Sequence, residues 1–516
     1  MMPAKSPEDR SFAVVRDLHS PEELDRLAAE LSLMASPGTA ILLRGELGSG
    51  KSAFARAFIR ALAPQGAVFD IPSPTFTLAQ TYGETRVPVA HADLYRVNSP
   101  AEIEELGLDD LIRNHILVIE WPERLGPVRW PNVLRIAIAG KGMHRNLRMA
   151  GEGTWSLALR RNETIGAFIE TTAWKGADRT FLEGDASFRR YESLRKGDDA
   201  VLLMDMPARP DGPPVKDGKP YSASAHLAEN IGAVIAINTR LCEMGYSAPL
   251  IHDFDTSTGL AIIEDLGREV FGCKIGRGHD MREPMKAAAD LLADMAKHDW
   301  PDTVPAGDGG IHRVSPYDEE ALLIETDLLP SWFWPHLRGA EAPPATHRQF
   351  AELWSEALPL AMPGKRCWTL RDYHSPNLLW LPHRAGLRRV GIIDTQDCVL
   401  GHPAYDLASL LQDARADIET GLVDELFDHY CRLRSSDAEF SRDNFSTAFA
   451  VLGAQRATKI LGIFARLSRR DGKHGYLRHI PRVARALERN LRHPKLRRLR
   501  HWFETQMPET LQKMTP

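Results

Sequence analysis

The chain has 516 residues, of which 43% are hydrophobic and 26% charged, and its formal net charge is −5 at pH 7. This length exceeds one ordinary hydrophobic core, so two or three folded units are expected. The small net charge excludes a general polycationic surface for nucleic acid, and five scattered cysteines without a CxxC pair favour thiols over disulfides or zinc. The polar N-terminus and the lack of long apolar runs indicate a cytoplasmic protein without a membrane segment.

Short β-rich runs alternate with helical stretches between residue 11 and about residue 159. The expected strands are Phe12–Val15, Ala40–Arg44, Val87–Ala92, Ile116–Glu120 and Val133–Ala139, and the expected helices are Glu22–Ala35 and Lys51–Leu62. Such alternation indicates a largely parallel sheet with helices on its faces. Asn146–Met149 and Thr154–Leu159, on either side of Gly151-Glu152-Gly153, are expected to form a hairpin that closes the segment.

A glycine-rich stretch joins the second of these strands to the helix at Lys51–Leu62. It reads Gly45-Glu46-Leu47-Gly48-Ser49-Gly50-Lys51-Ser52, which is the pattern GxxxxGK[ST] between a strand and a helix. Glycines allow successive backbone N–H groups to turn toward phosphates, and the helix N-terminus adds partial positive charge. We expect Lys51 to reach the β- and γ-phosphates of ATP and the Ser52 hydroxyl to bind Mg²⁺.

Two carboxylates end expected strands, at the edge where open α/β sheets bind their ligands. Asp93 follows Val87–Ala92, and Glu120 ends Ile116–Glu120. Because Mg²⁺ on a nucleotide takes only a few carboxylate ligands, both residues are candidates for a metal site. A helix cap or a solvated turn explains either residue equally well when it is taken alone.

Five ordered motifs in this part of the chain resemble the TsaE family, bacterial ATPases that support threonylcarbamoyladenosine synthesis on tRNA. They are the glycine-rich stretch, Ser73-Pro74-Thr75-Phe76-Thr77-Leu78, His91-Ala92-Asp93-Leu94-Tyr95-Arg96, Glu105-Leu106-Gly107-Leu108 and Val118-Ile119-Glu120-Trp121-Pro122. The resemblance covers about residues 11–150 and implies an α/β P-loop NTPase domain. It further implies a partner, a TsaB–TsaD-type protein complex, and only indirect contact with tRNA.

The same resemblance assigns roles to individual residues. It implies that Thr75 lies in a switch-like loop near the γ-phosphate and that Asp93 is catalytic in ATP hydrolysis. Glu120 would share Mg²⁺ with Ser52, and Trp121 would lie beside the nucleotide. The family usually has Thr at the position of Ser52, and either hydroxyl can bind the metal.

A second domain is expected at residues 162–516, after a P-loop domain at residues 1–155. Residues 180–265 combine short strands, a loop rich in Pro, Gly and Lys (Pro207–Pro220), and one amphipathic helix at Ser224–Met244. Beyond about Phe271 the pattern is mostly helical, apart from a strand-rich patch at 368–394. This organisation indicates an N-lobe at about 162–270 and a mostly helical C-lobe at about 271–516.

The strand-rich patch carries a pattern that kinase chemistry requires. It contains Leu370-Arg371-Asp372-Tyr373-His374-Ser375-Pro376-Asn377, followed by a short hairpin whose second strand ends at Asp394. In kinases one Asp accepts the proton of the attacking hydroxyl, while an Asn and a second Asp hold the metal ions. Asp372, Asn377 and Asp394 have the identities and separations for these three roles.

Further stretches resemble the aminoglycoside phosphotransferase superfamily and, within it, the AmgK kinases that phosphorylate N-acetylmuramate and N-acetylglucosamine at the anomeric hydroxyl. They are Gly184-Asp185-Ala186-Ser187-Phe188-Arg189-Arg190-Tyr191, Ile263-Glu264-Asp265-Leu266-Gly267, Ile393-Asp394-Thr395-Gln396-Asp397, Gly401-His402-Pro403-Ala404-Tyr405-Asp406-Leu407-Ala408 and Lys459-Ile460-Leu461-Gly462-Ile463-Phe464-Ala465-Arg466-Leu467. The resemblance spans about residues 162–505 and implies a bilobal protein-kinase-like α+β fold.

By this resemblance Asp372 is the base, and Asn377 and Asp394 are Mg²⁺ ligands. Glu264, Asp265 and Leu266 would form the hinge that binds adenine between the lobes, and Asp406 would anchor the catalytic loop. The acceptor would be an amino sugar of cell-wall recycling, and the cofactors of the whole chain would be ATP and Mg²⁺.

The second domain departs from kinases in two respects. It has no GxGxxG loop, whose place Gly184–Tyr191 takes, and no VAIK lysine, since Met204 and Asp205 stand near that position. Arg189, Arg190 or Arg195 could supply the missing charge, and the residues do not choose among them. Two alternatives therefore stay open: a kinase for another small alcohol, such as an aminoglycoside or choline, and a nucleotide-binding module that regulates the ATPase.

The stretch Arg456–Arg500 is rich in Lys and Arg and contains only two acids, Asp471 and Glu488. The favoured interpretation is a helical bundle with basic faces, some of whose charges line the phosphosugar pocket. Direct binding of tRNA is the alternative, and it would depend steeply on salt concentration.

Overall fold

The computed structural model describes residues 11–511 except 65–66, 68, 128–129, 141, 183–188, 209–211, 213, 217 and 229. Spatial contacts divide the chain into two compact units, Met1–Met204 and Asp205–Pro516. This division is based only on which residues are in contact in space. The domain boundary that the sequence predicts, between residues 155 and 162, therefore stays a prediction.

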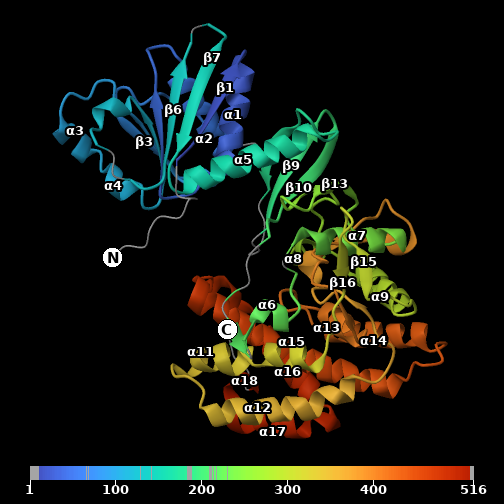
Figure 1. The fold of residues 1–516 in the computed structure, drawn as a ribbon. Coiled ribbons are helices and arrows are strands. Elements are labelled where there is room, and N and C mark those ends of the chain that lie inside the picture. The colour runs from blue at the N-terminus through green and yellow to red at the C-terminus, as the bar shows by residue number, and fades with distance from the viewer. Residues whose placement is uncertain are drawn as a thin grey trace. The chain divides into compact units, whose positions relative to one another are not determined.

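The first unit is built around a seven-stranded mixed sheet with the strand order β1-β7-β6-β2-β5-β4-β3 (Figure 1). The central strands β6, β2, β5 and β4 are parallel, whereas β1, β7 and β3 are antiparallel to their neighbours. The elements of this unit are β1 (Phe12–Leu18), α1 (Pro21–Leu33), β2 (Thr39–Arg44), α2 (Lys51–Leu62), β3 (Ala79–Tyr82), β4 (Val89–Asp93), α3 (Pro100–Glu105), α4 (Leu108–Leu111), β5 (Ile116–Glu120), β6 (Val133–Ala139), β7 (Arg145–Gly151), α5 (Thr154–Glu170), β8 (Asp178–Leu182), β9 (Arg190–Lys196) and β10 (Asp199–Asp205).

The sheet has a separate apolar core on each face, which explains the continuous apolar run in β2. Ile41 and Leu43 belong to the core that also contains residues of α1 and α2. Ala40 and Leu42 belong to the opposite core. A strand buried on both faces needs no alternation of polar and apolar residues, and this arrangement is typical of parallel sheets covered by helices.

The predicted hairpin at the end of the sheet is wrong in its second half. β7 is a strand, but Thr154–Leu159 forms the first turns of α5. Trp155 and Leu159 are four residues apart and both buried, so the helical period describes this stretch better than alternation does. Gly151 allows a close approach, because a Cβ there would lie 2.7 Å from the Trp155 backbone.

A buried ion pair ties β8 and β9 to α5 within the same unit. The two strands pair antiparallel, with Arg179 on β8 and Glu192 on β9. Arg179 Nε donates to Glu192 Oε2 at 2.7 Å, and its Nη1 donates to Asn162 Oδ1 on α5 at 2.8 Å. Both charged side chains are buried, so each depends on the other for its charge balance.

The second unit is mostly helical and contains several short antiparallel strand pairs, among them β13 with β14 and β18 with β19. The strands of this unit are β11 (Pro214–Lys216), β12 (Lys219–Pro220), β13 (Ile251–Asp255), β14 (Leu260–Glu264), β15 (Thr303–Pro305), β16 (Ile311–Arg313), β17 (Cys367–Thr369), β18 (Leu378–Trp380), β19 (Val390–Ile392) and β20 (Val399–Gly401). The helices are α6 (Tyr221–Ser224), α7 (Ile231–Glu243), α8 (Phe271–Gly276), α9 (Arg282–Met295), α10 (Glu319–Thr326), α11 (Trp334–Arg338), α12 (Pro344–Ala357), α13 (Ala404–Leu411), α14 (Thr420–Arg434), α15 (Arg442–Asp471), α16 (Ile480–Leu491), α17 (Arg497–Gln506) and α18 (Pro508–Leu511).

Helix α7 is shorter than the predicted helix Ser224–Met244. Asn230 caps its N-terminus, because the Asn230 side chain accepts a hydrogen bond from the backbone N–H of Gly232. Ser224 instead ends the short helix α6. The local capping residue, which lies inside the predicted range, decides where the long helix begins.

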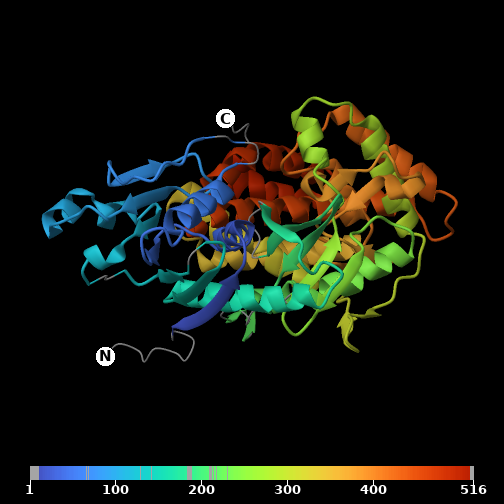
Figure 2. The same cartoon turned by 90° about the horizontal axis from the view of Figure 1, so that it is seen from above.

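Helix α15 is the centre of the helical part of this unit. Figures 1 and 2 show it beside α16, with which it is in contact. Among the described residues it is the one helix long and apolar enough to cross a membrane, and 83% of its apolar window is buried inside the protein. This degree of burial identifies α15 as a core helix.

We predict that Glu192→Ala destabilises the first unit by about 3–5 kcal/mol, because it leaves the buried Arg179 guanidinium without its anion. Unfolding in urea of the full-length variant and wild type measures this difference. Glu170→Ala is the matched control, since its pair with Lys175 is exposed, and it should cost less than about 1 kcal/mol. Equal effects of the two substitutions would contradict the prediction.

Candidate active sites

The glycine-rich stretch turns between β2 and α2, as the sequence predicts. Gly50 occupies the N-cap of α2 with a φ of 109°, a left-handed value that a side chain would strain. Lys51 Nζ donates to the backbone oxygens of Gly45 and Glu46, at 2.8 Å each, and lies 3.8 Å from the centre of the Trp121 ring. Burial lowers the pKa of Lys51, although nearby carboxylates oppose the shift.

Glu120 lies at the end of β5, where it contacts Ser52, the predicted magnesium ligand, and His91, a residue of one of the sequence motifs. Its Oε2 accepts a hydrogen bond from Ser52 Oγ at 2.7 Å, and its Oε1 is 3.0 Å from His91 Nε2. Glu120 and His91 are both buried. Because two different elements contact the two carboxylate oxygens, the side chain is fixed in one orientation toward the start of α2.

Asp93 is the neighbour of Glu120 in the sheet, since the two residues pair across β4 and β5. Its Oδ2 accepts hydrogen bonds from Ser73 Oγ at 3.3 Å and from Thr75 Oγ1 at 3.1 Å. Its Oδ1 accepts from the backbone N–H of Tyr95 at 3.0 Å. The predicted switch-like residue Thr75 therefore lies at the predicted hydrolytic carboxylate.

These oxygens suit a magnesium ion bound to a nucleotide. A hydroxyl and a carboxylate, Ser52 and Glu120, lie within hydrogen-bond distance of each other, and Asp93 is the next carboxylate along the sheet edge. Mg²⁺ prefers such oxygen ligands together with water and phosphate oxygens. Among the described residues, no group of three or more His, Cys, Asp or Glu side chains is arranged so that it could hold a metal ion.

The second predicted site lies in the loop that follows β17. Two hydrogen bonds hold the backbone of Asp372. Its N–H donates to Leu370 O at 2.7 Å, and its carbonyl oxygen accepts from Asn377 Nδ2 at 3.1 Å. Its side chain is 42% exposed, so a substrate can reach it. Burial opposes the charged form, but electrostatic interactions with His374 first and Lys459 next outweigh it and hold the pKa of Asp372 below its usual value.

Asn377 and Asp394 lie together at the hairpin formed by β18 and β19. Asn377 Nδ2 is 3.4 Å from Asp394 Oδ2, and Ile393 donates its backbone N–H to Asn377 O at 3.0 Å. Asp394 has a φ of 64° and Arg371 a φ of 67°, both in the left-handed region that side chains rarely adopt. The amide and carboxylate oxygens fit the pair of metal ligands that the sequence predicts, because both are hard oxygen donors on one short hairpin.

Asp406, at the start of α13, holds the loop that contains Asp372 through two backbone N–H groups. Its carboxylate accepts the N–H of Leu370 at 2.6 Å and that of Arg371 at 2.9 Å. Burial raises the pKa of Asp406 to about 7, against these two hydrogen bonds. The anchoring role that the sequence assigns to Asp406 is consistent with this geometry.

Sequence reasoning missed a buried carboxylate, Glu325 on α10, beside the catalytic loop. Glu325 pairs with Arg371 and, at 2.8 Å, with Lys459 on α15. Tyr317 and Gln455 also donate hydrogen bonds to it. The signal was present but weak, because Glu325 follows four apolar residues in a short helix.

The predicted adenine hinge is described by the structure, whereas the predicted phosphate loop is described only in part. Glu264 ends β14, where it forms an ion pair with Arg384, and Asp265 accepts from Arg268 Nη1 at 2.6 Å. Gly184–Phe188, in the predicted phosphate loop, lie outside the described residues. Arg190 donates to the backbone oxygen of Leu33 at 2.6 Å, and Arg195 is exposed.

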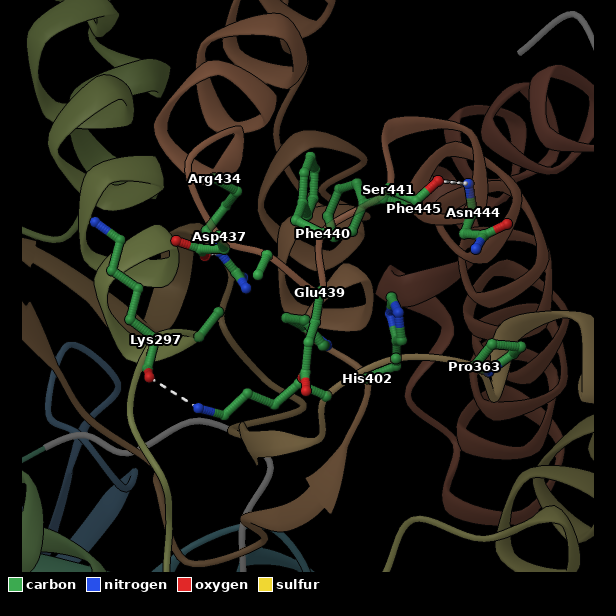
Figure 3. Close-up of a pocket in the computed structure, with 15 residues that line it drawn as sticks. Lys297, Pro363, His402, Arg434, Asp437, Glu439, Phe440, Ser441, Asn444 and Phe445 are labelled. Atoms are coloured by element: carbon green, nitrogen blue, oxygen red, sulfur yellow. Dashed lines mark hydrogen bonds and ion pairs between the residues drawn. The ribbon is translucent and has the colours of Figure 1, made fainter.

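Two of the cavities in the second unit differ in their relation to the predicted sites. One has a volume of about 160 Å³ and is lined by Asp372, His374, Arg456 and Lys459 among others, so it lies at the predicted base. The other, of about 280 Å³, is lined by Lys297, His402, Arg434 and residues of the segment before α15 (Figure 3). None of the site residues that the sequence predicts lines this cavity, and Lys365 in its lining is paired with Asp299.

Comparison with known proteins identifies two families along the chain. Residues 18–147 match the family described as threonylcarbamoyl adenosine biosynthesis protein TsaE. Residues 178–440 match the phosphotransferase enzyme family. These matches confirm the fold class that the sequence predicts, a TsaE-like α/β domain followed by a phosphotransferase-type kinase fold.

Two curated relatives match different parts of the chain. An N-acetylmuramate/N-acetylglucosamine kinase of Caulobacter vibrioides is 35% identical over 366 residues, which cover 68% of this chain and 98% of the relative. The tRNA threonylcarbamoyladenosine biosynthesis protein TsaE of Rickettsia conorii is 35% identical over 130 residues, which cover 25% of this chain and 73% of the relative.

Two solved structures are also similar to parts of this chain. YdiB of Bacillus subtilis is 23% identical with a TM-score of 0.25, covering 30% of this chain and 97% of its own. A choline/ethanolamine kinase family protein of Mesorhizobium loti is 16% identical with a TM-score of 0.41, covering 66% of this chain and 97% of its own.

We predict that Glu325→Gln destabilises the second unit by about 3–5 kcal/mol at pH 7. The reason is that the buried Arg371 and Lys459 side chains would lose the one carboxylate that balances their charges. The pKa of Glu325 in the folded chain lies below 4.5: burial opposes the charge, but Lys459 and Arg371 outweigh it. Its contribution is therefore complete above pH 4.5 and is lost as the pH falls through the folded pKa. Urea unfolding of both proteins at pH 7 and below pH 4.5 measures the difference.

The control for this substitution is Glu319→Gln, which changes an exposed acid in the same helix. It should shift the free energy of unfolding by less than about 0.5 kcal/mol at either pH. A difference between Glu325→Gln and wild type that does not shrink in acid would contradict the assignment of the effect to the Glu325 charge.

We also predict that Glu120→Gln weakens binding of Mg²⁺-ATP to the first site by about tenfold or more, because a charged metal ligand is lost. Nucleotide binding without Mg²⁺ should change much less. Fluorescence titration with and without Mg²⁺ measures both quantities, and Ser52→Thr, which keeps the hydroxyl, is the conservative control. Equal weakening in both conditions would show that Glu120 acts on folding and not on the metal.

Proposed function

Since the chain belongs to the TsaE family in its N-terminal part and to the phosphotransferase enzyme family in its C-terminal part, we propose that it combines two ATP-dependent activities. The first is a TsaE-like ATPase that supports threonylcarbamoyladenosine modification of tRNA. The second is a kinase that phosphorylates N-acetylmuramate and N-acetylglucosamine at the anomeric hydroxyl, in the recycling of cell-wall sugars. Both activities would be cytoplasmic.

The arrangement of Asp372, Asn377 and Asp394 carries the proposal for the kinase. The lowered pKa of Asp372 keeps its carboxylate ionised at neutral pH, so it can orient the sugar hydroxyl and accept its proton. The sugar oxygen then forms a bond to the γ-phosphorus of ATP, and the bond from that phosphorus to the bridging oxygen breaks. The products are the sugar phosphate, ADP and the proton held at Asp372.

Magnesium would be held by Asn377 and Asp394 in this site, where it supplies positive charge to the phosphates. The 3.4 Å between the Asn377 amide nitrogen and Asp394 Oδ2 supports the assignment, because one hairpin fixes both side chains. The backbone hydrogen bonds to Asp406 hold Asp372 in place relative to them. The chain itself therefore contributes position and a base, which are the main requirements of phosphoryl transfer.

For the ATPase, the contact of Thr75 with Asp93 supports a switch. Thr75 Oγ1 and Ser73 Oγ both donate to Asp93 Oδ2, so a ligand that takes the Asp93 carboxylate would release the loop that carries the two hydroxyls. We propose Asp93 as the hydrolytic residue and Ser52 with Glu120 as the magnesium ligands. A TsaB–TsaD-type protein complex is the proposed partner, and contact with tRNA would be indirect.

A phosphorylation assay of the full-length protein tests the two proposed sites separately. We expect ATP-dependent phosphorylation of N-acetylmuramate and N-acetylglucosamine, with phosphorus NMR placing the phosphate on the anomeric oxygen. Asp372→Asn keeps the shape of the side chain but removes the base, and should lower kcat by about 10²–10⁴-fold. Lys51→Ala should leave this rate unchanged.

The acceptor panel includes an aminoglycoside, choline and a simple hexose. Transfer to one of these but to neither amino sugar would keep the kinase and overturn its substrate. Nucleotide binding by the second unit without transfer to any acceptor would favour a regulatory module. The ATPase is measured in the presence of a TsaB–TsaD complex, and Lys51→Ala should abolish it while Asp372→Asn leaves it intact.

A further inference from the structure

One face of α15 forms a wall of the cavity at Asp372. Arg456, Lys459, Ile460, Ile463 and Phe464 all line this cavity. Their spacing of three and four residues places them on one side of a helix. The wall is cationic toward the N-terminus of α15 and apolar toward its C-terminus.

Arg456 differs from the other buried cations around the catalytic loop. Lys459 pairs with Glu325 at 2.8 Å, and Arg371 pairs with the same carboxylate. Arg456 is only 5% exposed, yet in the part of the chain that the structure describes no carboxylate forms an ion pair with it. Its contacts are long: 3.5 Å to Gln412 O and 3.4 Å to His374 Nδ1.

The acidic residues that line the cavity are engaged elsewhere. Asp413 accepts the backbone N–H groups of Ser375 at 2.7 Å, Arg415 at 2.6 Å and Ala416 at 3.0 Å. Asp372 is the proposed base, and a direct ion pair with Arg456 would remove the oxygen that must meet the hydroxyl. A buried guanidinium without a carboxylate is costly, and an anionic ligand would offset that cost.

We propose that Arg456 binds the carboxylate of an acidic amino-sugar acceptor, so that the cavity favours N-acetylmuramate over N-acetylglucosamine. This inference rests on the proposed kinase function. The two sugars differ by the lactyl group of N-acetylmuramate, which adds one carboxylate and one methyl group. Guanidinium and carboxylate form two parallel hydrogen bonds, which gives both affinity and orientation.

The apolar part of the wall fits the remainder of such an acceptor. Ile460, Ile463 and Phe464 follow Arg456 along the helix and line the same cavity. Methyl groups of the lactyl and acetyl substituents would bury apolar area there. Asp372 at the same cavity would meet the hydroxyl to be phosphorylated.

Arg456→Gln in the full-length protein tests the proposal by comparing the two sugars. We expect kcat/KM for N-acetylmuramate to fall by about tenfold to a hundredfold, the effect of losing a charged hydrogen bond. The value for N-acetylglucosamine should stay within about threefold of wild type, because that sugar makes no such bond. The KM for ATP should not change.

Three further variants separate the possible causes. Arg456→Lys keeps the charge but loses the paired hydrogen bonds, and should recover part of the activity on N-acetylmuramate. Arg415→Gln changes the other guanidinium that lines the cavity, which lies 5.6 Å from the Tyr476 ring. Arg485→Gln, an exposed arginine on α16, controls for the charge of the protein, and melting temperatures control for folding.

Each result decides one point. Equal losses on both sugars with a raised KM for ATP would assign Arg456 to the phosphates and overturn the inference, while the proposed function stands. Selective loss in Arg415→Gln but not in Arg456→Gln would overturn it in favour of Arg415. A wild-type protein that phosphorylates neither sugar would overturn the proposed function and this inference with it.

Discussion

Two buried cations from distant parts of the chain, Arg371 and Lys459, share the carboxylate of Glu325. Arg371 immediately precedes the proposed base, and Lys459 belongs to the wall of the cavity at Asp372, so one anion positions both sides of the proposed site. The attraction is strong because water is excluded, and removal of any one charge leaves the others uncompensated. The helical bundle around α15 provides this exclusion of water, and the catalytic loop depends on it.

The first unit also contains a buried carboxylate that is shared by side chains from two elements. Glu120 contacts Ser52 from α2 and His91 from β4, and its register partner in the sheet is Asp93. Parallel pairing of β4 and β5 therefore determines which acidic residues meet at the phosphate edge. In both units a buried anion links segments that are far apart in sequence, and the reactive residues are attached to those segments.

Motifs that lie close together in the sequence were predictable, and long-range partners were not. The glycine-rich stretch and the strands Ile116–Glu120 and Val133–Ala139 follow from local pattern, because the residues that define them are neighbours. The local pattern predicts a strand at Thr154–Leu159, although the buried residues of this stretch follow the helical period. The sequence does not distinguish Arg456 from the other basic residues of its helix. Its burial depends on how α15 packs against the loop that contains Asp372, and the sequence pattern does not show that packing.

The left-handed backbone at Arg371 and Asp394 limits how far this protein can be stabilised. Glycine would relieve the strain of about 1–3 kcal/mol at either position. It would also remove a cation that balances Glu325, or an oxygen of the proposed metal site. At Arg371 the loss of the buried ion pair with Glu325 outweighs the relieved strain, so glycine there would destabilise the protein. At Asp394, selection for thermostability alone would favour a change that removes the proposed metal ligand, so a stabilising library for this chain should keep Asp394 fixed.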